Sequence, residues 1–211
     1  MKRILLIQSS LFSGNSASSK LGEEFVSQIQ ARYPGSNVTT LDLASAPLPH
    51  LDAEEFSSWT IPAEERSPEQ QRLAGLSDEL IDELFAHDTL VLAVPMYNLG
   101  IPSTLKAWID RVARAGKTFR YTASGPEGLV KGMQTFVLTT RGGQYQGTPL
   151  DTQTGYLKGI LGLMGITDVE MVYAENLARG GEVRENSINT ARRLIEEIVG
   201  DTVPEVQYAS A

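Results

Sequence analysis

The chain has 211 residues, of which 41% are hydrophobic and 21% are charged, and its formal net charge at pH 7 is −8. This length allows one sizeable hydrophobic core, while the acidic balance disfavours nucleic-acid binding, which depends on a basic surface. There is no cysteine, so disulfides, thiolate nucleophiles and iron-sulfur ligation are excluded. The two histidines, His50 and His87, have no metal-ligand spacing, and we expect no metal site.

Five short runs of apolar and β-branched residues have the composition of strands that are covered on both faces. In chain order they are Arg3 to Gln8, Val38 to Leu43, Thr89 to Val94, Thr135 to Thr139 and Val169 to Tyr173. Apolar residues at helical spacing lie between and after these runs, around residues 21–29, 73–85, 105–112, 156–164 and 194–198. The alternation predicts an α/β fold with a five-stranded parallel sheet and helices on both faces. We expect residues 1–211 to form a single domain.

The first strand follows two basic residues, Lys2 and Arg3, which raises the possibility of an export signal. Its apolar run, ILLI, is too short for the hydrophobic part of such a signal and for a membrane span. We therefore expect a cytoplasmic protein that does not bind membranes.

One segment, residues 44–68, contains several prolines and has no clear period. It is longer than most loops in compact domains, but Phe56, Trp59 and Ile61 predict that it is ordered. Two interpretations stay open: the segment packs over the edge of the sheet, or it is an arm that contributes to a partner contact or a pocket wall. The acidic pairs at 54–55 and 64–65 are expected to be solvated.

Ligands of open parallel sheets bind beyond the carboxyl ends of the strands, so the loops after the first, third and fourth strands are the candidate site. The first loop, SSLFSGNSASSKL at residues 9–21, is rich in serine and leads into a helix whose first amides point at the loop. Hydroxyls beside a helix N-terminus favour phosphate. The loop lacks the lysine of a Walker loop and the three glycines of a dinucleotide turn, which favours a monophosphate. The alternative is that Ser16 or Ser18 only caps the helix.

The other two loops have different chemistry. In PMYNLGIP, residues 95–102, Met96, Tyr97 and Leu99 could lie against a flat ring while Asn98 meets its polar edge. In TTRGGQYQGTP, residues 139–149, a pair of glycines allows the backbone to approach a ligand closely. Taken singly, each loop has a plain structural explanation, as packing or as a turn. Their occurrence at three ligand-facing positions of one sheet indicates a binding site.

Five motifs in this order closely resemble the FMN-dependent NADH-azoreductases, which are flavodoxin-like homodimeric reductases of quinones and azo dyes. The motifs are SSLFSGNSAS, PMYN, ARAGKTFRYTASGPEGL at residues 113–129, TTRGG, and LGLMGITDV at residues 161–169. The resemblance extends from about residue 2 to about residue 200. It implies a flavodoxin-like FMN-binding domain and a homodimer.

The resemblance also assigns cofactor-binding residues. Ser10, Ser16, Ala17 and Ser18 match contacts to the FMN phosphate and ribityl chain, with Ala17 where relatives often have a polar side chain. The isoalloxazine loop is matched by Met96, Tyr97, Asn98 and Leu99, with Leu99 at a position that is commonly Phe. The loop at the pyrimidine end of the flavin is matched by Thr140, Arg141, Gly142 and Gly143, with Thr140 in place of the usual serine. Tyr121 is similar to a substrate-pocket aromatic of the family.

The function that this resemblance implies is an FMN-dependent NAD(P)H oxidoreductase of quinones and azo compounds. Hydride passes from NADH or NADPH to the flavin and then to the substrate, so the protein mainly positions two rings and needs no nucleophile. Because donor and acceptor occupy one pocket in turn, ping-pong kinetics are expected. The alternative is a flavodoxin-like electron carrier that does not react with nicotinamide. Trp108 and the apolar side chains of residues 44–68 favour an enclosed pocket at a dimer interface, and hence the reductase.

Overall fold

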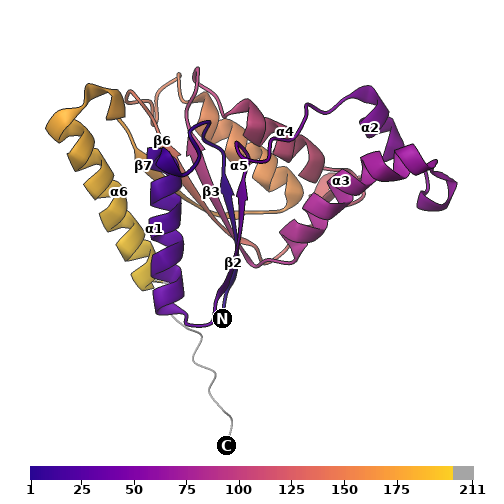
Figure 1. The fold of residues 1–211 in the computed structure, drawn as a ribbon, viewed down its shortest axis with the longest axis horizontal. Coiled ribbons are helices and arrows are strands. Elements are labelled where there is room, and N and C mark those ends of the chain that lie inside the picture. Colours follow the sequence, from indigo (N-terminus) through magenta and orange to yellow (C-terminus); the bar gives the residue numbers. More distant parts are fainter. Residues whose placement is uncertain (202–211) are drawn as a thin grey trace, which may run out of the picture.

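The computed structural model describes residues 1–201, which form a central sheet between two layers of helices (Figure 1). The sheet has five parallel strands in the order β2-β1-β3-β6-β7. Its strands are β1 (Arg3–Gln8), β2 (Asn37–Asp42), β3 (Thr89–Pro95), β6 (Gln134–Thr140) and β7 (Asp168–Ala174). All five strands were predicted from the sequence, each with its ends correct to within one residue.

Each face of the sheet is covered by its own helices (Figure 1). One face carries α1 (Ala17–Arg32) and α6 (Gly181–Asp201), and the other carries α3 (Pro68–Phe85), α4 (Ser103–Val112) and α5 (Thr152–Met164). Strand side chains alternate between two cores, so that Ile4 and Leu6 pack under α1 and α6 while Leu5 and Ile7 face the other layer. The α/β fold with helices on both faces is confirmed.

Local signals set the ends of these helices. The α3 helix begins with a capping box, in which Ser67 and Gln70 exchange side-chain to backbone hydrogen bonds. His87 follows the end of α3, and its Nδ1 lies 2.7 Å from the carbonyl oxygen of Glu83. The α5 helix ends at Gly165, whose φ of 95° is accessible to glycine at little cost. None of the described helices is long and apolar enough to cross a membrane.

The segment at residues 44–68 contains a short helix, α2 (Ala53–Ser58), and a 3-10 turn, η2 (Ala63–Glu65). Its helix α2 packs against α3, and the segment lies on the side of the molecule away from α1 and α6 (Figure 1). The expectation that both acidic residues at 54–55 are solvated was wrong for Glu55. Its side chain is 4% exposed and forms a two-point ion pair with Arg111 of α4.

The helix α4 also corrects the use of Trp108 as an interface residue. Its side chain is only 1% exposed and lies in the core between α4 and the sheet. The apolar positions of α4 therefore stabilise this chain by burial, and Trp108 supplies no argument for a second subunit.

A small antiparallel hairpin was not predicted. It consists of β4 (Phe119–Thr122) and β5 (Gly125–Gly128). Gly128 packs so closely on Gly165 that a Cβ atom at Gly128 would lie 2.1 Å from the Gly165 nitrogen. Because α5 runs back from the carboxyl edge of the sheet, this contact places the hairpin near the amino end of the strands.

Candidate functional site

The three candidate loops meet at the carboxyl edge of the sheet, where they enclose a cleft of about 470 Å³. The cleft lies where the chain order of the strands reverses, between β1 and β3. This position is the usual ligand site of doubly wound sheets. The residues that line it are Ser10, Phe12, Asn15, Ser16, Ala17, Pro95, Met96, Tyr97, Thr140, Arg141, Gly142, Leu177 and Arg184.

The first loop brings the N-terminus of α1 to the cleft. Ser16 is the N-cap, and its hydroxyl accepts a hydrogen bond from the Ser19 amide at 3.1 Å. The capping interpretation is therefore correct for Ser16, and it does not remove the anion site. The backbone amides of Ala17 and Ser18 lie in the first turn of α1, where the helix offers them no carbonyl acceptor. They therefore remain available to a ligand.

The second loop is a tight turn with two residues in a left-handed conformation. Tyr97 and Gly100 exchange backbone hydrogen bonds, while Asn98 and Leu99 between them have φ values of 50° and 65°. Such conformations are costly for residues other than glycine and cluster at functional sites. The turn is tied to its surroundings, because the Thr152 hydroxyl donates to the Leu99 carbonyl. Tyr97 also reaches the first loop, with its Oη atom 3.1 Å from the Ser10 Oγ atom.

The third loop offers backbone amides. The carbonyl oxygens of Gly142 and Gly143 accept hydrogen bonds from Ala178 and Asn176, which fixes the course of the loop. Within residues 1–201, neither glycine amide has a hydrogen-bond acceptor. A Cβ atom at Gly143 would lie 2.9 Å from the ring of Tyr145, so this ring packs directly on the glycine. The two amides are thus positioned by the fold and free to meet a polar ligand atom.

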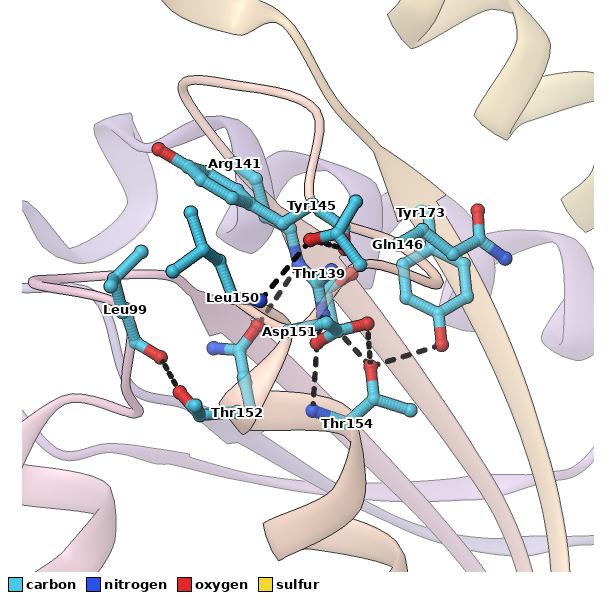
Figure 2. Close-up of polar contacts among 12 residues, drawn as sticks. Leu99, Thr139, Arg141, Tyr145, Gln146, Leu150, Asp151, Thr152, Thr154 and Tyr173 are labelled. Carbon is cyan, nitrogen blue, oxygen red and sulfur yellow. Dashed lines mark hydrogen bonds and ion pairs between the residues drawn. The ribbon is translucent and has the colours of Figure 1, made fainter.

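The side chain of Arg141 connects this loop to Asp151 and Thr154 at the start of α5 (Figure 2). Its guanidinium group is buried and donates to Asp151 at 2.9 Å, to Glu175 at 3.2 Å and to Thr154 at 2.9 Å. It also lies over the ring of Tyr173, 4.9 Å from the ring centre. With its donors and charge satisfied inside the protein, the Arg141 side chain is structural, and only the rest of the residue borders the cleft.

The charges around this arginine shift the pKa of Asp151. Burial raises the pKa of this carboxyl group, but hydrogen bonds from Arg141 and Thr154 outweigh it, so that the net pKa lies below the usual 3.8. Nearby on α5, burial raises the pKa of Tyr156 to about 12, with a further contribution from Asp110. Tyr156 lines a second cavity, which Gly100 and Gln153 also line.

Gln153 was missed by the sequence reasoning. Its side chain is 1% exposed and joins two of the candidate loops. The Oε1 atom accepts from Arg141 Nε at 3.2 Å, while Nε2 donates to the carbonyl oxygens of Pro95 at 3.1 Å and Gly100 at 3.4 Å. Nothing in the local sequence marks this glutamine, because all three of its partners are distant along the chain or on another loop.

Most, but not all, of the twelve residues expected to contact the flavin line the cleft. Eight of the twelve line the cleft: Ser10, Ser16, Ala17, Met96, Tyr97, Thr140, Arg141 and Gly142. The other four do not line it: Ser18, Asn98 and Gly143 are chain neighbours of lining residues, and Leu99 is two positions from Tyr97. Tyr121 is different, because it lies on the hairpin near the amino end of the strands and is 75% exposed. Within one chain, Tyr121 does not contribute to the cleft.

The chemistry of the cleft fits FMN. The free amides at the N-terminus of α1 suit a phosphate monoester. Met96 and Tyr97 provide an apolar wall for an aromatic ring, and the amides at Gly142 and Gly143 can donate to ring oxygen or nitrogen atoms. The distribution of these groups along the cleft matches one long ligand with an anionic tail and a flat, polar-edged head.

A five-stranded sheet with this strand order and a ligand cleft at its β1/β3 reversal defines a flavodoxin-like protein. The chain belongs to this family, because a family model described as a flavodoxin-like fold matches residues 2–199.

Similar proteins narrow the family further. An FMN-dependent NADH:quinone oxidoreductase of Pseudomonas fluorescens is 48% identical over 198 residues, which cover 94% of this chain and 100% of the relative. A protein of the same name from Alcanivorax borkumensis is 49% identical, with 90% of this chain and 96% of the relative covered. The crystal structure of a Bacillus anthracis azoreductase has a TM-score of 0.86 at 26% identity, with 94% of this chain and 99% of that chain covered. The chain is thus a member of the group of flavodoxin-like proteins that includes these reductases.

Proposed function

We propose that the protein is an FMN-dependent NADH:quinone oxidoreductase that also reduces aromatic azo compounds. The observation that carries the proposal is the convergence of three loops with complementary chemistry on one cleft at the strand-order reversal. The names of the similar quinone oxidoreductases and azoreductases support the same activity.

In this proposal each loop has a defined task. Ser10, Ser16, Ala17 and Ser18 hold the phosphate and ribityl end. Met96, Tyr97, Asn98 and Leu99 support the isoalloxazine ring, and the rigid turn at Asn98 and Leu99 fixes the position of that wall.

The third loop acts electrostatically. The Gly142 and Gly143 amides donate toward the pyrimidine end of the flavin, where they would stabilise negative charge. Thr140 and Arg141 keep this loop in place, Arg141 by its buried ion pairs. When bound, FMN supplies the two-electron chemistry that links the nicotinamide to the quinone. NADH is the proposed donor, since the relatives are named for it.

The alternative is an electron carrier without nicotinamide turnover. The relatives that cover nearly the full chain are named as oxidoreductases, which favours the enzyme. A direct comparison separates the two functions. The enzyme consumes NADH continuously when benzoquinone is present, whereas the carrier binds FMN and does not turn over.

We also propose that the protein is a homodimer whose second copy supplies Tyr121 to the substrate pocket. In support, the loops that follow β1 and β6 expose Leu11, Phe12 and Leu150 by 59%, 69% and 53%, and Phe12 also lines the cleft. Tyr121 is 75% exposed, contacts the ring of Phe119 edge-on and does not line the cleft of its own chain. A cytoplasmic location is part of the same proposal, because the nicotinamide donor is an intracellular metabolite.

Three measurements test the proposal. Purified protein reconstituted with FMN should be yellow and should oxidise NADH faster when benzoquinone is added. Sedimentation should give a dimer, and Tyr121→Ala should raise the quinone KM while FMN affinity stays unchanged. Protein that cannot bind FMN would overturn the function, and a monomer with full activity would overturn the shared pocket alone.

A further inference from the structure

The phosphate end of the cleft is poor in side chains that can hold an anion. Ser16 Oγ lies 3.2 Å from Ser18 Oγ and 2.9 Å from Ser19 Oγ, and both of these partners are fully buried. The serine hydroxyls are thus largely engaged with each other and with the capping interaction. Ala17, which stands between them at the cleft, contributes only a methyl group.

A phosphate monoester carries nearly two negative charges at neutral pH, and two backbone amides compensate only part of them. The cleft is lined by two arginines, Arg141 and Arg184. The charge of Arg141 is already balanced by Asp151 and Glu175. Arg184 is therefore the cation that remains for a ligand.

The position of Arg184 fits this task. It lies in the first turn of α6, across from Ala17 of α1, and the same two residues also line an adjoining cavity of about 420 Å³ between the two helices. In the part of the chain that the structure describes, its side chain makes one hydrogen bond, from Nη1 to the Leu177 carbonyl oxygen at 3.4 Å, and no ion pair. Arginine has five N–H donors in a planar fork, so most of its donors can still reach a phosphate.

We infer that Arg184 binds the 5′-phosphate of the flavin and takes the place of a polar side chain at Ala17. This inference rests on the proposed FMN-dependent function and adds a residue that none of the three candidate loops contains. It assigns to α6 a direct role in cofactor affinity, in addition to its role in covering the sheet.

The test compares FMN with riboflavin, which lacks the phosphate. The apoprotein is titrated with each flavin, and binding is followed by the quenching of flavin fluorescence. Arg184→Gln should weaken FMN binding by about 10- to 100-fold, the range expected for a charge-assisted contact, and should change riboflavin binding less than about twofold. Arg184→Lys should fall between Arg184→Gln and wild type, because it keeps the charge and loses the fork.

Arg193→Gln is the matched control. Arg193 is exposed on the same helix, about 13 Å further along its axis, and its replacement removes the same charge without touching the cleft. It should leave the affinity for both flavins unchanged. Circular dichroism shows whether each variant has kept its fold, which the exposure of both arginines favours.

The outcomes separate the inference from the function. Equal FMN affinity for wild type and Arg184→Gln would overturn the role of Arg184 and leave the proposed function intact. The same holds if Arg184→Gln raises only the KM for NADH, since the residue would then act on the donor. Wild-type protein that binds neither flavin would overturn both.

Discussion

The buried ion pair between Glu55 and Arg111 should be a main stabilising contact of the segment at residues 44–68. Arg111 is fully buried, and its guanidinium donates to Glu55 at 2.8 and 2.6 Å and to the carbonyl oxygens of Pro49 and Ala107 at 2.7 and 3.0 Å. Glu55→Ala removes two of these four contacts and leaves a cation without a counterion in the interior. Breaking such a pair by removing one partner costs about 3 to 5 kcal/mol.

For a protein of this size, each kcal/mol corresponds to a shift in melting temperature of about 2 to 4 °C. Glu55→Ala should therefore lower the melting temperature by about 6 to 20 °C, measured by circular dichroism on the apoprotein. The double variant Glu55→Leu with Arg111→Met should recover most of this loss, because apolar replacement of a whole buried pair is often neutral.

Glu54→Ala is the matched control, because Glu54 is the exposed neighbour on the same short helix. It should change the free energy of unfolding by no more than about 0.5 kcal/mol. The reasoning is refuted if Glu55→Ala is as stable as Glu54→Ala. It is also refuted if the double variant is no more stable than Glu55→Ala, since the loss would then not come from an unpaired charge.

Three further predictions concern the loops and the hairpin. Gln153→Leu should destabilise the protein by about 1 to 3 kcal/mol in urea denaturation, since it leaves buried polar groups unpaired, and it should weaken FMN binding. Unchanged stability and unchanged FMN affinity would refute the role of Gln153 in positioning the two loops. The folded-state pKa of Asp151 is lowered, so its contribution to the free energy of unfolding is fully present above the unfolded pKa near 3.8 and is lost as pH falls through the lower folded pKa. Asp151→Asn should therefore be less stable than wild type at neutral pH and should lose less stability on acidification. Parallel curves of stability against pH for the two proteins would contradict this. Gly128→Ala should lower the free energy of unfolding by about 2 to 3 kcal/mol, because its Cβ would meet backbone atoms of Met164 and Gly165. Gly155→Ala, at a position in α5 with open space, should be neutral or stabilising. Similar melting temperatures for the two variants would refute the close packing of Gly128 on Gly165.

The layered fold was predictable because its signals are local. The run from Arg3 to Gln8 has four consecutive apolar residues, Ile4 to Ile7, and in the structure these four are buried by the helices on both faces of the sheet. The rule that ligands bind at the carboxyl ends of parallel strands then pointed to the three loops that meet at the cleft. The hairpin at β4 and β5 lacked such a signal, because its strands are short and β5 reads Gly-Pro-Glu-Gly.

What escaped prediction depends on side chains that meet across long stretches of sequence. The ion pair between Glu55 and Arg111 joins residues 56 positions apart, so an acidic pair on a loop looked solvated. Arg141 was assigned to the flavin by position, but its side chain turns toward Asp151 and Glu175. Arg184 reaches the cleft from a helix outside the loops, which only the packing of α6 against α1 reveals.

The most direct test of the account follows the visible absorbance of the purified, FMN-reconstituted protein in two additions without oxygen. NADH alone should bleach the flavin absorbance, and benzoquinone added afterwards, once NADH is exhausted, should restore it. Protein that binds FMN but keeps its full absorbance in the presence of NADH would contradict the proposed reductase and favour the electron carrier.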